Sequence, residues 1–236
     1  MQQIKYLPAS SRGNTNIGWL NGFHSFNISG ASYKDRQPFG PLVVLNEDTV
    51  QPGTGFGTHS HSNMEIITIP LQGSINHIDN TGSEAVLKTG DVQVMSAGTG
   101  IAHSEYNRDR QNILRFLQIW ILPERRNVEP RYQQVSLGND EPNRFRQLVS
   151  PDPEDGNPWI HQQAWISLGN FEAGYAVSYP VKKPGNGIYV FLLSGEINCS
   201  GQSLLPKDAI EIENSELIKI NVIGQSQILL IEVPLF

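Results

Sequence analysis

Two short pairs of residues in this chain of 236 residues have the types and spacing of metal ligands. His59 and His61 form the first pair, and His103 and Glu105 form the second. Residues i and i+2 of a β-strand point to the same face, so each pair would present both side chains on one side of its strand. If the two strands face each other across a barrel, three imidazoles and one carboxylate converge on one point. Such a set suits iron, zinc, copper or nickel, and it leaves positions on an octahedral ion for water, substrate or O₂.

Either pair alone is a weak signal, because two histidines on a strand are often no more than solvated side chains. The placement of the pairs favours the metal site. The first pair follows a glycine-rich run and precedes an apolar segment that ends at Gly73, and the second follows the turn-rich sequence SAGTG. For His24 and His77 we expect surface or packing roles. For Cys199, in an apolar strand-like run, we expect a buried inert thiol.

The composition is that of a turn-rich globular protein, with 38% hydrophobic residues, 22 Gly and 15 Pro. Acidic residues outnumber basic ones by 23 to 17 and no basic stripe occurs, which argues against direct nucleic-acid binding. A single cysteine excludes an internal disulfide. The sequence shows neither a signal peptide nor an apolar run long enough to span a membrane, so we expect a cytoplasmic protein that does not contact membranes.

Short apolar or alternating segments rich in β-branched residues recur along the chain, and helical spacing is almost absent. Residues 64–82 predict two strands in a hairpin around Gln72 and Gly73. The apolar run 113–122 predicts a strand that is buried on both faces or alternates toward a second sheet. The long segment 10–40, rich in Gly, Ser and Asn, is expected to cover a barrel or line its mouth.

The two halves of the chain resemble each other, since IITIPLQGSIN in the first aligns with YVFLLSGEIN in the second. Gly73 aligns with Gly195 at an offset of 122 positions, which is too long for a solenoid repeat and indicates two copies of one β-domain. The same offset places Val181 and Lys183 opposite the first histidine pair. The counterpart of the second pair reads LIKINV, without histidine, so we expect one metal per chain in the N-terminal half.

The predicted fold is all-β, with two tandem jelly-roll barrels in one chain and the metal site only in the N-terminal barrel. We expect an N-terminal metal-binding domain over residues 1–130 and a C-terminal domain without metal ligands over 163–236. The segment 131–162 is polar and rich in proline, and we expect it to bridge the two. Its DPEDGNP sequence predicts an exposed turn.

The sequence resembles the cupin superfamily, and within it the pirin family. Gly53, His59-x-His61 and Glu65 resemble the first cupin motif, and the stretch from Gly90 to Asn107 resembles the second. FGTHSHSNMEIIT, LQGSINHIDNTG, GDVQVMSAGTGIAHSEYN and LQIWILP are similar to pirin signatures in order and spacing. The similarity is greatest to bacterial pirin-like proteins described as quercetin 2,3-dioxygenases.

The resemblance implies a ligand set of His59, His61, His103 and Glu105. General cupins use the glutamate of their first motif instead, which is Glu65 here. Glu65 shares the parity of the first histidine pair, so geometry alone does not exclude it as a ligand. We favour Glu105 because the HSE sequence is complete, and we expect Glu65 to line the pocket or to support a ligating histidine.

This chain departs from the family in one region. The aromatic run common in the family before the barrel reads HSFNISGASY here. The pocket wall near Phe26 and Tyr33 is therefore expected to differ, and Phe26 is a candidate substrate contact.

The function that the resemblance implies is dioxygenation of flavonols such as quercetin with O₂ and release of carbon monoxide. The cofactor would be one divalent ion, with Fe(II) favoured and Zn, Mn, Ni, Co or Cu also compatible with the donors. Glu105 would also serve as general base. An alternative is a metal-bound, non-enzymatic pirin with a protein partner, linked to redox sensing or transcription. Another cupin reaction, such as sugar isomerisation, is less favoured because the HSE sequence points to pirins.

Overall fold

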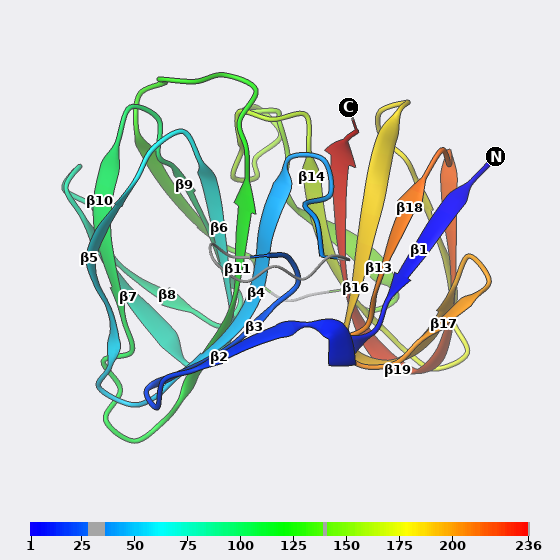
Figure 1. Cartoon of the computed structure of the whole chain (residues 1–236), viewed down its shortest axis with the longest axis horizontal. Helices are drawn as coiled ribbons and strands as arrows, with labels where there is room; N and C mark the ends of the chain where they lie inside the picture. Colours follow the sequence, from blue (N-terminus) through cyan, green and yellow to red (C-terminus); the bar gives the residue numbers. More distant parts are fainter. Residues whose placement is uncertain (28–35, 139–140, 236) are drawn as a thin grey trace.

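The computed structural model describes residues 1–27, 36–138 and 141–235, and these form β-strands with one short 3₁₀ helix, η1 (Ala9–Ser11). The described strands lie in three sheets and pair in antiparallel fashion throughout (Figure 1). The all-β prediction is therefore confirmed. No helix among the described residues is long and apolar enough to cross a membrane.

Two of the sheets build the N-terminal half of the molecule. The seven-stranded sheet has the order β12 (Arg131–Ser136), β9 (Asp91–Ser96), β6 (Glu65–Gln72), β11 (Leu114–Ile121), β4 (Leu42–Val50), β3 (Leu20–His24) and β2 (Gly13–Asn16). The four-stranded sheet has the order β5 (Gly55–His61), β10 (Ile101–Tyr106), β7 (Ser74–Asp79) and β8 (Glu84–Lys88).

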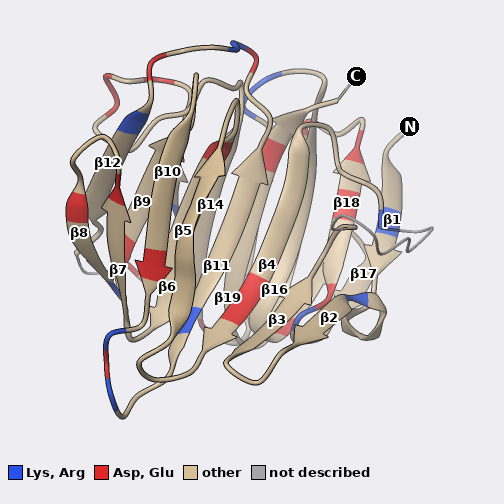
Figure 2. Cartoon of the chain, turned by 60° about the vertical axis from the view of Figure 1, so that its left-hand side comes forward, with Lys and Arg blue, Asp and Glu red and all other residues tan. Residues whose placement is uncertain are grey.

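The third sheet builds the C-terminal half. Its path is β1 (Gln3–Leu7), β18 (Ala209–Glu213), β16 (Asn186–Cys199), β19 (Leu217–Pro234), β14 (Trp165–Phe171) and β13 (Arg144–Val149). Two further strands join it, β15 (Ala176–Pro180) on β19 and β17 (Gln202–Leu204) on β16. Figure 2 shows Lys and Arg scattered among Asp and Glu along the strands and loops.

The largest apolar cluster lies between the two halves and not inside either barrel. Leu117 and Ile119 on β11 pack in it together with Phe191 and Leu229 of the C-terminal sheet. The alternate β11 residue Phe116 faces a smaller cluster inside the N-terminal barrel. For residues 113–122 the two predicted alternatives hold together, because β11 is largely buried on both faces and one face packs toward the C-terminal sheet.

The chain does not form the hairpin expected around Gln72 and Gly73. Strand β6 pairs with β9 and β11, whereas β7 pairs with β8 and β10, so the chain passes here from one sheet to the other. Gly73 has φ +79°, and a Cβ on it would lie 2.9 Å from the carbonyl oxygen of Ile113. Turn residues in the sequence indicate where the chain changes direction, but they do not indicate which strand each of the two flanking strands will pair with.

Two segments tie the halves together. Strand β1 pairs with β18 of the C-terminal sheet, where it covers what would be an open edge (Figure 1). The expected N-terminal domain of residues 1–130 thus gives its first strand to the other half. Within the expected bridge, β12 pairs with β9 and β13 pairs with β14, so each half receives one strand.

Candidate metal centre

The histidine pairs lie on neighbouring strands of the four-stranded sheet. His103 on β10 is in register with His59 on β5, and Ile101 is in register with His61. The two strands do not face each other across the barrel but are paired in one sheet, and the side chains converge all the same. Because adjacent strands lie about 4.8 Å apart, histidines in register on one face bring their rings together directly.

The three imidazoles form a tight triangle. Ring centroids are 4.5 Å apart for His59 and His103, 4.9 Å for His59 and His61, and 5.1 Å for His61 and His103. One nitrogen from each ring lies within 4.8 Å of the others. This spacing allows all three nitrogens to reach one ion of the first transition series.

Two buried polar atoms at this site have no hydrogen-bond partner among the described residues, Nε2 of His103 and Oε1 of Glu105. A buried unsatisfied polar group costs about 1–3 kcal/mol, so such atoms call for a ligand. Nδ1 of His59 lies 2.8 Å from the carbonyl oxygen of Gly57, an arrangement that leaves its Nε2 free. The donors therefore fit a divalent cation.

Glu105 approaches the cluster from the same strand as His103, past an irregularity in the pairing of β10 with β5. Oε2 of Glu105 accepts a hydrogen bond of 3.4 Å from Gln118, whose own Oε1 accepts one of 2.8 Å from Thr68. Burial raises the pKa of Glu105 to about 7, and the nearby Asp48 carboxylate adds to this.

His77 is the residue at this site that the sequence reasoning missed. It is fully buried, and its Nε2 lies 3.0 Å from Oδ2 of Asp79. Its Nδ1 lies 3.5 Å from Nδ1 of His103, and with His103 and Glu105 it forms a second, overlapping group of candidate ligands. The expected packing role fits its burial, but its contact with His103 depends on the register of β7 with β10. The sequence does contain one indication, because His77 and Asp79 are two residues apart and therefore lie on the same face of a strand, where the carboxylate can orient the imidazole.

Two of the three imidazoles, those of His61 and His103, are held in the neutral form that binds metals. Burial lowers the pKa of His61 to about 4, and the neighbouring His59 contributes. Burial also lowers the pKa of His103 to about 3, with further contributions from His59 and His77. Neutral imidazole is the form that donates a lone pair to a metal ion.

The structure does not bring the two predicted pocket residues to this cluster. Glu65 is buried on the opposite face of β6 from Thr68, and its Oε2 accepts a hydrogen bond of 2.6 Å from Ser96. Phe26 lies in the core between the halves, with its ring centroid 5.4 Å from that of Tyr189. Tyr33 lies outside the described residues.

The corresponding end of the C-terminal barrel holds a carboxylate instead of histidines. The fully buried Glu232 accepts hydrogen bonds from the Tyr179 hydroxyl, the backbone N–H groups of Lys182 and Lys183, and the Asn186 amide. Both candidate metal groups found among the described residues belong to the N-terminal half, as predicted. Cys199 is buried, which raises the pKa of its thiol to about 12, as expected for an inert thiol.

Two β-barrels with a histidine cluster in the first define a two-domain cupin. The family model described as Pirin matches residues 8–121, and the Quercetinase C-terminal cupin domain matches residues 147–233. An Escherichia coli protein named quercetin 2,3-dioxygenase is 33% identical over 98% of this chain and 99% of its own length. A Caulobacter vibrioides pirin-like protein is 34% identical over 97% and 99% of the two chains. This chain belongs to the pirin family.

Solved structures agree with this assignment. The crystal structure of YhhW from Escherichia coli has a TM-score of 0.94 and 32% identity, and covers 99% of both chains. A second structure, bacterial pirin YhhW in complex with nickel(II), has a TM-score of 0.93 and 31% identity over 99% of this chain and 100% of its own.

Proposed function

We propose that this protein is a metal-dependent dioxygenase that cleaves flavonols such as quercetin with O₂ and releases carbon monoxide. The observation that supports it most directly is the convergence of three imidazoles on one point. Two buried atoms at this cluster, Nε2 of His103 and Oε1 of Glu105, have no hydrogen-bond partner among the described residues. Relatives over the full length are named quercetin 2,3-dioxygenase, and one relative was solved with nickel(II).

The proposed ligands are His59, His61, His103 and Glu105, and Fe(II) is the proposed native ion. A bound divalent ion would acidify a ligated hydroxyl group and bring it together with O₂. The His77–Asp79 pair would fix the position of the His103 ring next to it.

Glu105 is the proposed general base. Gln118 engages its Oε2, so Oε1 is the oxygen that would bind the ion. If Glu105 loosened from the ion, the same oxygen could accept a proton from the substrate hydroxyl. The aromatic ring of Trp120 lies 5.0 Å from that of His61, and the ring of Phe56 lies 6.4 Å from that of His59. Two flanking aromatic rings suit a flat aromatic substrate.

Metal content tests the ligand set. We expect His103→Ala to lose most of the bound metal while circular dichroism remains that of the folded chain, because the large core lies elsewhere. His24→Ala is the matched control, since His24 lies in the same half but belongs to neither candidate metal group. Full metal retention in His103→Ala, measured by plasma mass spectrometry, would contradict the set.

A second pair of variants separates the two buried glutamates. Glu65→Gln should retain metal better than Glu105→Gln, because the Glu65 carboxylate bonds Ser96 on the other face of β6. Both changes remove one charge and keep the shape. The reverse order of metal content would place Glu65 in the coordination sphere instead of Glu105.

Turnover tests the activity. We expect Fe(II)-loaded protein to bleach quercetin absorbance in air with release of carbon monoxide. A chelated sample, an anaerobic sample and His103→Ala should each lose this bleaching. Bound metal without quercetin decay would contradict the dioxygenase proposal and favour a metal-dependent interaction role.

A further inference from the structure

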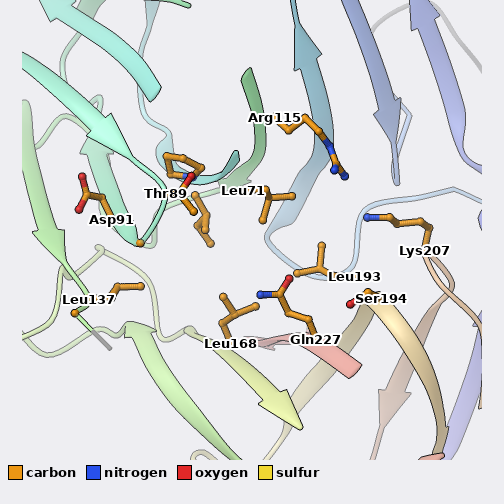
Figure 3. A pocket seen from close by; sticks show the side chains of 14 residues that line it. Leu71, Thr89, Asp91, Arg115, Leu137, Leu168, Leu193, Ser194, Lys207 and Gln227 are labelled. Carbon is orange, nitrogen blue, oxygen red and sulfur yellow. The ribbon is translucent and has the colours of Figure 1, made fainter. Parts of the chain in front are cut away.

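A cavity lies between the two halves of the molecule, and its lining residues are different from those of the histidine cluster. It has a volume of about 310 Å³, and it is lined from both halves of the chain (Figure 3). Leu71 and Arg115 come from the N-terminal sheets, and Leu168, Leu193 and Lys207 from the C-terminal half. None of its lining residues belongs to the candidate metal groups.

Three cations share one carboxylate beside this cavity. Oε1 of Glu47 lies 2.7 Å from both Arg115 Nη2 and Lys207 Nζ, and its Oε2 lies 3.4 Å from Arg12 Nη1. The Arg12 side chain is buried and also donates to the carbonyl oxygen of Phe23, so it does not face the cavity as a free charge. The buried Asp48 carboxylate also interacts with Arg12. Two carboxylates still do not balance three cations, so the cluster keeps a positive charge at the cavity wall.

Arg115 and Lys207 have spare donors. A guanidinium has five N–H groups and an ammonium has three. Each cation has one hydrogen bond with Glu47, through Nη2 of Arg115 and Nζ of Lys207, so further N–H groups of both are left to donate. Their side chains are 37% and 28% exposed, whereas the Glu47 side chain is 9% exposed. Figure 3 shows the two cationic heads on one side of the cavity, pointing toward one another.

The carboxylate of Asp91, which also lines the cavity, does not compete for these cations. Its Oδ2 accepts hydrogen bonds of 2.9 Å from the backbone N–H of Lys88 and 3.0 Å from the Gln134 amide. Figure 3 places Asp91 across the cavity from Lys207. The positive charge is therefore confined to one side.

The rest of the wall combines leucine side chains with polar groups such as Thr89 and Ser194. Leu71, Leu168 and Leu193 lie between the cationic side and Leu137 at the far end, with the Gln227 amide among them (Figure 3). The volume is at the lower end of the range for ligand pockets. A ligand with one anionic head and a short apolar body matches this arrangement of charge and surface.

We propose that this cavity binds a small organic carboxylate, with its head between Arg115 and Lys207 and its apolar body against Leu71, Leu168 and Leu193. A carboxylate suits a guanidinium and an ammonium that lie close together, as the contacts of Glu47 Oε1 with both cations show. The site is independent of the metal centre.

The test is calorimetric titration of the full chain with sodium hexanoate after treatment with a chelator, so that no metal can bind the carboxylate. Hexanoate should bind, and butyrate should bind more weakly by roughly fourfold per methylene. Absence of hexanoate binding would overturn the proposal. Equal binding of hexan-1-ol, or tighter binding of hexyl phosphate, would overturn the carboxylate assignment.

Variants of the lining residues test whether hexanoate binds in this cavity. Lys207→Met should weaken hexanoate binding at least about tenfold, equivalent to ~1.4 kcal/mol, and Lys207→Arg should largely preserve it. The exposed Lys219 lies outside the cavity, so Lys219→Met is the matched control. Ser194→Phe should abolish binding by filling the cavity without a change of charge. Unchanged affinity in both Lys207→Met and Ser194→Phe, each shown to be folded by its thermal transition, would contradict the site.

Discussion

Glu65 and Glu105 illustrate how two buried carboxylates of the same half take different roles. Glu65 is surrounded by donors, namely the Ser96 hydroxyl, the backbone N–H of His161 and the charge of Arg131. Glu105 keeps one oxygen without a partner. A buried carboxylate with satisfied oxygens fits a role in packing, whereas an unsatisfied one beside imidazoles is available for a cation.

The pKa of Glu65 predicts a pH dependence of stability. Burial raises this pKa from 4.5 to about 6, although Ser96, Arg131 and His161 oppose the shift. Between these values the folded chain binds more protons than the unfolded chain, so the contribution of Glu65 to stability falls as pH rises through this window. Relative to wild type, Glu65→Gln should therefore gain about 2 kcal/mol between pH 4.5 and pH 6.5.

Urea unfolding of the chelated protein at several pH values measures this difference. The control is Glu84→Gln, which removes an exposed carboxylate from β8 and should track the wild type. Parallel pH profiles for Glu65→Gln and wild type would show that the Glu65 carboxylate has no raised pKa in the folded chain.

At the residue scale, strand parity was enough to group His59 with His61 and His103 with Glu105. It failed for Glu65, because parity has meaning only within one strand and the chain changes sheets between β5 and β6. His77 was missed for a related reason. Its place beside His103 is set by the pairing of β7 with β10, and no local pattern encodes this pairing.

At the scale of elements, the two glycines that align in the duplication, Gly73 and Gly195, both have a positive φ. Gly73 and Gly195 have φ +79° and +92°, and both meet backbone of a neighbouring segment closely. Turn residues and β-branched runs predicted where the strands lie. They could not predict that β6 and β7 belong to different sheets while β16 continues through Gly195 as one strand, because strand partners are set by long-range packing.

Substitution of Gly195 tests this close approach. A Cβ there would meet the Gln225 carbonyl oxygen and lie 2.6 Å from Cα of Ser226, whereas one on Gly185, at φ +89°, would meet nothing within 4 Å. Both alanine variants lose the freedom of glycine at positive φ, a cost of about 1–2 kcal/mol. Gly195→Ala should lose roughly 1–3 kcal/mol more by overpacking. Equal free energies of unfolding in denaturant would contradict the contact.

At the scale of the molecule, the two halves share a hydrophobic core and a sheet edge, unlike tandem domains that are joined only by a linker. The cluster between them contains fully buried residues of both halves, such as Leu117 and Leu229. Strand β1 completes the C-terminal sheet from the N-terminal end of the chain, and Tyr6 donates a hydrogen bond of 2.8 Å to Asp208 there. Separation of the halves would expose this core and open a sheet edge.

We therefore expect the metal-free chain to unfold in one calorimetric transition, with equal van't Hoff and calorimetric enthalpies. Leu229 and Leu230 on β19 provide matched variants, because the first packs between the halves and the second inside the C-terminal barrel. Each leucine-to-alanine change should cost about 2–5 kcal/mol and shift the whole transition. If the halves unfolded independently, Leu230→Ala would lower one transition and leave an N-terminal one in place, and that result would contradict the shared core.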